Sequence, residues 1–165
     1  MRKTVRAIFG STLLALAMVG PAHSASMNVG VAAYNREDFT TAARIFTPYA
    51  EAGNIKAQFY LGFMYSTGRG VPQNYIMAVY WYRRSAEQGD PTAQYMLGLL
   101  YDKGQGVPQN YIEAHKWLNL ATAHAPRATR DYSARLRDAI ATKMTRGELG
   151  TARLRALEWV PVPER

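Results

Sequence analysis

Hydrophobic and small residues recur through the middle of the chain with the spacing of paired helices. Residues 57–81 align with residues 93–117 at an offset of 36, and 15 of the 25 aligned positions are identical. Each copy begins with an apolar helical face. This face comprises Leu61, Gly62 and Tyr65 in the first copy and Leu97, Gly98 and Tyr101 in the second. Two copies of one structural unit are therefore present.

Glycine and proline positions divide each copy into two helices. One glycine is placed to end the first helix, a second follows two residues later, and a proline precedes the next helical stretch. These are Gly68, Gly70 and Pro72 in the first copy and Gly104, Gly106 and Pro108 in the second. The second helix carries its own apolar face, with Ala78 and Trp81 in the first copy and Ala114 and Trp117 in the second. An isolated pair would leave apolar surface uncovered, so the pairs must stack into an all-α, α/α solenoid.

The shared pattern resembles a known repeat. Ala-x-x-x-Leu-Gly-x-x-Tyr-x-x-Gly-x-Gly-Val-Pro-x-Asn-x-x-x-Ala-x-x-Trp is similar to the Sel1-like repeat (SLR), a relative of the tetratricopeptide repeat, with one unit over 57–92 and another over 93–126. The resemblance implies a right-handed superhelix of antiparallel helix pairs that acts as an adaptor in protein complexes. Bacterial proteins of this kind are often exported and tied to envelope signalling, exopolysaccharide export or virulence.

The pattern changes on both sides of the two repeats. In 25–56, Tyr34 and Ala42 are 8 residues apart, against 13 between Tyr65 and Ala78, and the Gly-x-Gly-Val-Pro loop is missing. This stretch is expected to form a shorter, tetratricopeptide-like helix pair.

After Pro126 the sequence predicts a C-terminal capping helix pair over 127–160, followed by a tail over 161–165. The first capping helix has an amphipathic face of Tyr132, Leu136, Ile140 and Met144. Thr145 and Glu148 have the spacing of a capping box that opens the second. Its expected face consists of Leu149, Ala152, Ala156 and Trp159.

The first 24 residues have the features of a signal peptide. Residues 1–6 are basic, residues 7–19 are apolar, and small residues follow, so cleavage is expected after Ser24. About 13 apolar residues are too few for a helix to cross roughly 30 Å of hydrocarbon. The expected location is the periplasm.

Charge argues against a nucleic-acid partner. The formal net charge of +8 includes three basic residues of the signal peptide, which leaves +5. Residues 25–126 carry 8 basic and 7 acidic side chains, a balance of +1, and residues 127–165 carry 9 and 5, a balance of +4. A nucleic-acid protein would need a concentrated basic stripe.

No residue pattern indicates catalysis, a metal or a small-molecule cofactor. The chain has no cysteine, which excludes disulfides and thiolate sites. His115 and His124 are nine residues apart on one predicted helix and so point to opposite sides, and both are interpreted as surface residues. The glycine loops lack the third glycine or the Lys-Ser/Thr pair of phosphate-binding motifs.

Aromatic residues give the remaining functional signal. The first helix of each repeat carries large side chains away from its Leu-Gly-Tyr face, a side that lines the concave groove in tetratricopeptide proteins. By that resemblance, the partner-binding candidates are Phe59, Tyr60, Phe63, Tyr95, Met96 and Leu99. The alternative is that Phe59 and Tyr95 simply pack against the neighbouring repeat.

Three functions remain open from the sequence. The first is a periplasmic adaptor that binds a protein or peptide partner of the cell envelope. The second is an envelope-surface protein whose Arg127, Arg130, Arg135 and Arg137 contact anionic lipid or glycan. The third is a cell-wall or β-lactam hydrolase, as described for cysteine-rich relatives, whose disulfide pattern is absent here.

Overall fold

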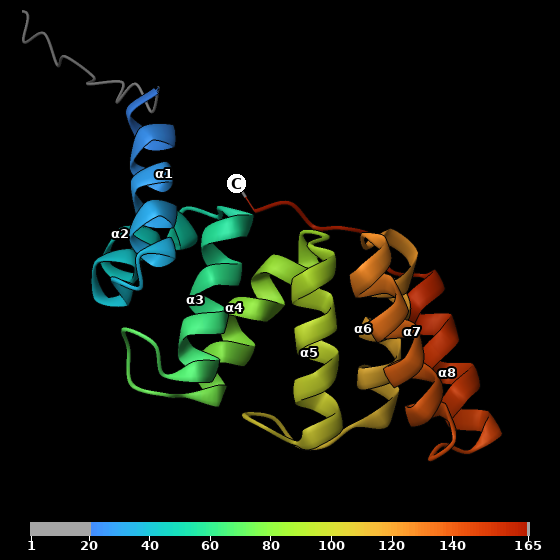
Figure 1. Cartoon of the computed structure of the whole chain (residues 1–165). Helices are drawn as coiled ribbons and strands as arrows, with labels where there is room; N and C mark the ends of the chain where they lie inside the picture. Colours follow the sequence, from blue (N-terminus) through green and yellow to red (C-terminus); the bar gives the residue numbers. More distant parts are fainter. Residues whose placement is uncertain (1–20, 165) are drawn as a thin grey trace, which may run out of the picture.

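The computed structural model describes residues 21–164, and helices dominate this part of the chain (Figure 1). Residues 21–164 form eight helices and no strand. These are α1 (Pro21–Asn35), α2 (Phe39–Glu51), α3 (Ile55–Thr67), α4 (Tyr75–Glu87), α5 (Pro91–Lys103), α6 (Tyr111–His124), α7 (Arg127–Ala141) and α8 (Arg146–Leu157). Most of the expected signal peptide lies outside the described residues, and its cleavage site falls near the start of α1.

Consecutive helices pack side by side from α1 to α7, which gives the all-α solenoid that the sequence predicted (Figure 1). The last helix departs from this order, because α8 packs on α6. At the C-terminal end, α6 is therefore covered by both α7 and α8. Within residues 21–164, no helix is long and apolar enough to cross a membrane.

Side-chain caps fix where most helices begin. Each capping oxygen accepts a hydrogen bond from the backbone N–H three residues later, which satisfies one free donor of the first turn. The capping residues are Asp38, Asn54, Asn74, Asp90, Asn110 and Thr145. Thr145 and Glu148 form the reciprocal capping box that their spacing predicted.

The two helices of each pair approach closely at one glycine. A Cβ atom added at Gly62 would lie 2.6 Å from the ring of Tyr82, and one at Gly98 would lie 2.7 Å from the side chain of Leu118. The same approach occurs in the first pair, where a Cβ at Gly30 would lie 2.7 Å from the ring of Phe46. Side chains of the second helix thus fill the space that each glycine leaves open.

Gly30 also corrects the sequence alignment of the first pair. When Gly30 is matched to Gly62, the place of Tyr65 is taken by Ala33, which is fully buried. Tyr34, which the sequence analysis matched to Tyr65, lies one position further along and contacts Tyr60 and Phe63 of α3. The shorter connection between α1 and α2 hid this shift, because it removed the glycine loop that marks the other repeats.

The loops between the helices of a repeat rest on the preceding pair. Gly70 has φ +72° and lies against the backbone of Phe39 at the start of α2, while Gly106 has φ +73° and lies against the backbone of Tyr75 at the start of α4. A Cβ atom at either position would overlap those backbone atoms. Gly68 and Gly104 end α3 and α5 in the left-handed conformation, as predicted.

A buried glutamine joins each repeat to the pair before it. Gln58 donates a hydrogen bond of 3.1 Å to the carbonyl of Ala50 at the end of α2, and Gln94 donates one of 3.2 Å to the carbonyl of Ala86 at the end of α4. Both glutamines are fully buried. Each amide adds a side-chain hydrogen bond to a carbonyl that also accepts from the backbone N–H of Gly53 or Gly89, and the sequence analysis did not single the glutamines out.

Two residues of the C-terminal cap lie elsewhere than the sequence suggested. Tyr132 is 61% exposed, and the buried face of α7 passes instead through Ser133 and Ile140. Ser133 bonds the carbonyl of Thr129, which lets a polar side chain occupy this buried position. Trp159 lies beyond the end of α8, where its ring meets that of Trp117 edge to face at 6.4 Å.

His115 is buried, so the interpretation as a surface histidine was wrong for it, whereas His124 is exposed. His115 occupies the position of Val79 in the preceding repeat, which is also buried. Burial lowers the pKa of His115. The nearby Arg137 and Arg153 lower it further, while Asp138 raises it. Burial in the α6 interface thus favours the neutral form of the ring.

We expect Gly70→Ala and Gly106→Ala each to lower the free energy of unfolding by at least about 2 kcal/mol, because the methyl group meets backbone and φ is positive. Gly150→Ala is the control, since it lies within α8 with nothing within 4 Å of an added Cβ. It should raise stability by about 0.5–1 kcal/mol. Urea denaturation of the three variants measures this, and equal effects at all three positions would contradict the proposed loop contacts.

We also expect His115 to make the fold acid-sensitive. The unfolded chain binds a proton at this side chain near pH 6.5, whereas the folded chain binds it only at lower pH, so stability falls as the pH drops through that value. His115→Val, the residue found at position 79, should remove this component between about pH 7.5 and pH 5. Unfolding free energies of both proteins across this range test the point, and parallel pH profiles would refute it.

Candidate functional site

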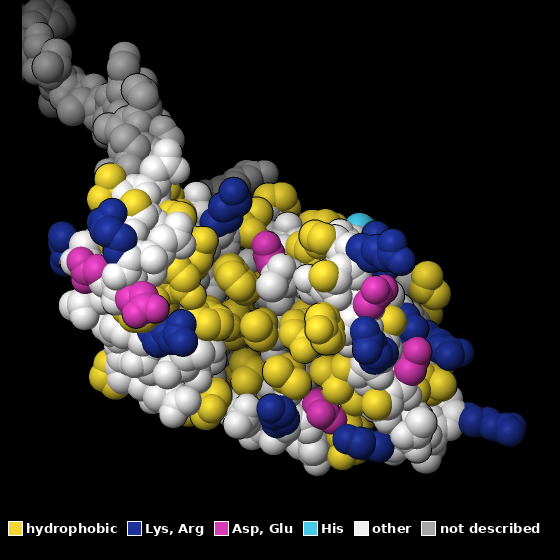
Figure 2. Space-filling view, viewed as in Figure 1, with side chains coloured by type: hydrophobic (Ala, Val, Ile, Leu, Met, Phe, Trp, Pro, Cys, Tyr) yellow, Lys and Arg dark blue, Asp and Glu magenta, His cyan; other side chains and the backbone are white. Residues whose placement is uncertain are grey.

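The six partner-binding candidates lie on α3 and α5, and all six side chains are half-buried. Figure 2 shows hydrophobic side chains gathered across the middle of the face that carries these two helices. Positively and negatively charged side chains are scattered around this apolar area. The structure thus places the candidates on two neighbouring helices and leaves each of them partly open to solvent.

Five of the six candidates, all except Leu99, pack against buried core clusters. Tyr60 stacks on the buried Phe46 of α2 at 4.7 Å with nearly parallel rings. Phe59 packs against Tyr82 at 5.9 Å between ring centroids. Met96 packs against the central core cluster, and Tyr95 against the C-terminal one. The Phe59–Tyr82 contact lies within one repeat, and the cluster that Tyr95 joins is formed by α6 of its own repeat and by α7, whereas the packing alternative expected contact with the neighbouring repeat.

Phe63 belongs to an aromatic cluster capped by an exposed cation. Its ring lies 6.2 Å from Tyr34, and Tyr34 lies 5.3 Å from Phe39. The guanidinium of Arg69 lies 5.7 Å from the Phe63 ring and 5.2 Å from the Phe39 ring, within range of cation–π attraction. Burial raises the pKa of Tyr34, although Arg69 opposes that shift.

The surface formed by this cluster is therefore apolar at the aromatic rings and cationic at Arg69. Arg69 is the residue between the two glycines of the first loop, where the sequence analysis considered only phosphate binding. Arg69 closely follows the helix that carries Phe63. This closeness in the sequence could have indicated that the arginine contacts the aromatic rings.

Leu99 occupies in α5 the position that Phe63 occupies in α3. It is half-buried, and it is not among the side chains that pack against the three core clusters of the described residues. Leu99 is therefore the candidate best placed to contact a partner without first being withdrawn from the core, whereas Phe63 packs against the central core cluster and is half-buried.

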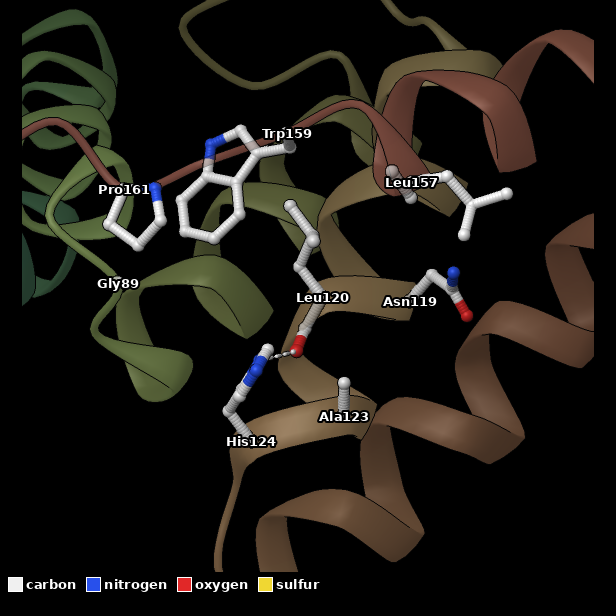
Figure 3. A pocket seen from close by; sticks show the side chains of 9 residues that line it. Gly89, Asn119, Leu120, Ala123, His124, Leu157, Trp159 and Pro161 are labelled. Carbon is white, nitrogen blue, oxygen red and sulfur yellow. Dashed lines mark hydrogen bonds between the residues drawn. The ribbon is translucent and has the colours of Figure 1, made fainter.

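A cavity of about 430 Å3 lies outside the candidate face, between α6, α8 and the segment that follows α8. Its walls are mostly apolar and include Leu120, Leu157, Trp159 and Pro161 (Figure 3). The Nδ1 atom of His124 lies 3.3 Å from the carbonyl of Leu120 at one side. None of the six candidates lines this cavity, and the sequence analysis did not predict it.

The described residues provide no cluster of three or more His, Cys, Asp or Glu side chains that could hold a metal ion. The side chain of Asp38 serves as the N-terminal cap of α2.

Comparisons with known proteins agree with this architecture. The Sel1 repeat family matches residues 55–90 and 91–125. A crystal structure of a protective antigen present in uropathogenic Escherichia coli strains, which displays an SLR fold, superposes with a TM-score of 0.75 at 29% identity over 83% of this chain. The chain spans only 29% of the length of that protein. No curated protein matches the sequence.

A second solved structure, a Sel1 repeat protein from Oxalobacter formigenes, is 33% identical, with a TM-score of 0.60. The match covers 68% of this chain and 88% of that one. Its extent and identity, together with the two matched repeats and the stacked helix pairs, show that the chain belongs to the Sel1 repeat family.

Proposed function

We propose that this protein is a non-catalytic periplasmic adaptor that binds a protein partner through the face formed by α3 and α5. Sel1 repeats commonly mediate protein–protein interactions, and solenoids of this family are generally non-catalytic. The observation that carries the proposal is the pair Phe63 and Leu99, which occupy equivalent places in two successive repeats and remain partly exposed. Arg69 adds a cation beside this apolar area.

An extended peptide or a helix of the partner would lie across the two repeats. Aromatic and aliphatic anchors in partly formed pockets supply most of the affinity in such interfaces. We place the partner in the envelope, in a process such as signalling or exopolysaccharide export. The support for this location is the sequence of residues 1–24, with its basic, apolar and small-residue regions.

The basic helix α7 gives less support to the alternative of an envelope-surface protein. Arg130 donates to the carbonyl of Ala125 and Arg135 to that of Asp131. Arg137 bonds Asn119 and Asp138. Three of the four arginines proposed for lipid or glycan contact are thus engaged within the chain.

Site-specific photocrosslinking in cells tests the binding face. A benzophenone amino acid in place of Leu99 should capture one discrete envelope protein, and Phe63→Ser in the same chain should reduce that adduct at least about tenfold. The matched control places the probe at Ile76 of α4, which is 68% exposed and should capture nothing specific. Tyr60 is left unchanged, because its stack on Phe46 makes it part of the core.

Circular dichroism must show that the Phe63→Ser chain remains helical. Equal labelling from positions 99 and 76, or an adduct that a folded Phe63→Ser chain retains, would contradict the proposed face.

Export is tested separately by the N-terminus of the protein from a periplasmic fraction. We expect the mature chain to begin at Ala25, and Ser24→Tyr to leave an uncleaved precursor, because the signal peptidase needs a small residue at this position. Recovery of full-length protein in the cytoplasm would reject the periplasmic location without bearing on the binding face.

A further inference from the structure

The segment that follows α8 runs back along the solenoid as an extended strap. This strap, residues 158–164, leaves α8 and passes along one edge of the molecule towards the start of α3, and it is the red segment in Figure 1. The long loops of the two repeats lie at the opposite edge (Figure 1). The strap therefore lies over the turns that connect successive helix pairs.

Few contacts hold the middle of the strap. The backbone N–H of Val162 donates to the carbonyl of Glu87 at 2.8 Å, and that of Glu164 donates to the side chain of Gln88 at 3.3 Å. Pro161 lies close to Gly89 (Figure 3). The side chains of Val160 and Val162 are 68% and 63% exposed. Little apolar area is buried between Val160 and Val162, so polar contacts hold this part of the strap.

The end of the strap is held by a carboxylate-binding cradle. The Nε atom of Arg84 donates to one carboxylate oxygen of Glu164 at 2.8 Å, and a terminal nitrogen of the same guanidinium contacts the other oxygen. Gln58 donates to that second oxygen at 2.9 Å. This is the bidentate geometry that makes arginine selective for carboxylates.

The cradle is held in shape by contacts that do not involve the strap. The Arg84 guanidinium lies 5.2 Å from the ring of Trp81 and also donates to the carbonyl of Glu51 at 3.3 Å. Gln88 donates to the carbonyl of Gly53 at 3.1 Å and to the side chain of Gln58 at 2.8 Å. The donors would thus remain oriented if Glu164 left, which reduces the entropy lost by an incoming ligand.

The repeat architecture does not require this cradle. At the equivalent junction of the next repeat, Gln94 keeps the place of Gln58, but Leu120 replaces Arg84 and His124 replaces Gln88. Of the cradle residues, only the glutamine is shared by the two junctions. Arginine at position 84 adds carboxylate recognition at one junction.

We propose that the cradle and the adjoining edge form a second binding site, which takes an extended acidic peptide of a partner protein in exchange for the strap. The strap is the intramolecular occupant and shows the ligand chemistry. A backbone N–H meets the carbonyl of Glu87, and a glutamate two residues later enters the cradle. Because the strap is tethered, its effective concentration is in the millimolar range, and it limits access by weak ligands. This site is separate from the α3 and α5 face.

The test uses the full chain with the strap released. Val162→Pro removes the N–H that meets Glu87, and Glu164→Ala empties the cradle. Both positions lie beyond the last helix, and Val162 is mostly exposed, so the double variant should fold. The probe is a fluorescent, capped synthetic peptide with the sequence of residues 159–164, measured by fluorescence polarisation. The strap-released chain should bind it at least about tenfold more tightly than the wild type.

Adding Arg84→Leu, the residue found at position 120, should abolish that binding while circular dichroism and thermal unfolding show a folded chain. A peptide with glutamine in place of the final glutamate should bind at least about tenfold more weakly. The proposal is overturned if the strap-released chain binds no peptide, or if neither the Arg84→Leu change nor the glutamine peptide alters binding. It is also overturned if the wild type is a dimer in sedimentation experiments and Glu164→Ala makes it monomeric, because the occupant would then be a second copy.

Discussion

Close approach of two helix backbones at a single glycine is the constraint on which this solenoid depends. At Gly30, Gly62 and Gly98 the second helix places a large side chain where any Cβ atom would collide. That contact fixes the rotation of one helix against the other. It thereby decides which side chains fill the core and which remain on the α3 and α5 face. The glycine loops and the buried glutamines then set the distance to the preceding pair.

The sequence predicted the features that depend on periodicity and local chemistry. The 36-residue offset located α3 to α6, and the glycine, proline and threonine signals placed helix ends within a few residues. It did not locate Gly30, because the shorter first connection removed the marker that aligned the other pairs. It misplaced Tyr132, because the i, i+3 and i, i+4 spacing of a helical face admits both Tyr132 and Ser133, the neighbouring residue that is buried in the structure. The strap has no periodicity, and its contacts join residues far apart in the chain.

The candidate site was only partly predictable for a related reason. The repeat placed the six candidates on α3 and α5, and the structure shows that each of them is half-buried there. Whether a side chain on either helix is free depends on the neighbouring pair, as with Tyr60, which stacks on a phenylalanine of the non-repeating first pair. Positions where the two repeats differ, such as Arg84 against Leu120 and Val79 against His115, separate what stacking requires from what one junction adds.

The bond between Gln58 and Glu164 joins residues 106 positions apart, and it changes how disorder can spread through the array. In a linear stack of repeats each unit touches its neighbours only, and an end unit can fray without disturbing the centre. Here Glu164 of the strap bonds Gln58 near the junction between α2 and α3. The helices from α4 to α8 therefore lie between two residues that are joined by a long-range contact. Fraying of α8 would weaken the contacts of Glu164 and expose the Arg84 cradle, which lies far from α8 along the solenoid. Thermal motion at the C-terminal end is thereby coupled to a site near the beginning of the solenoid, which an open stack would leave unaffected.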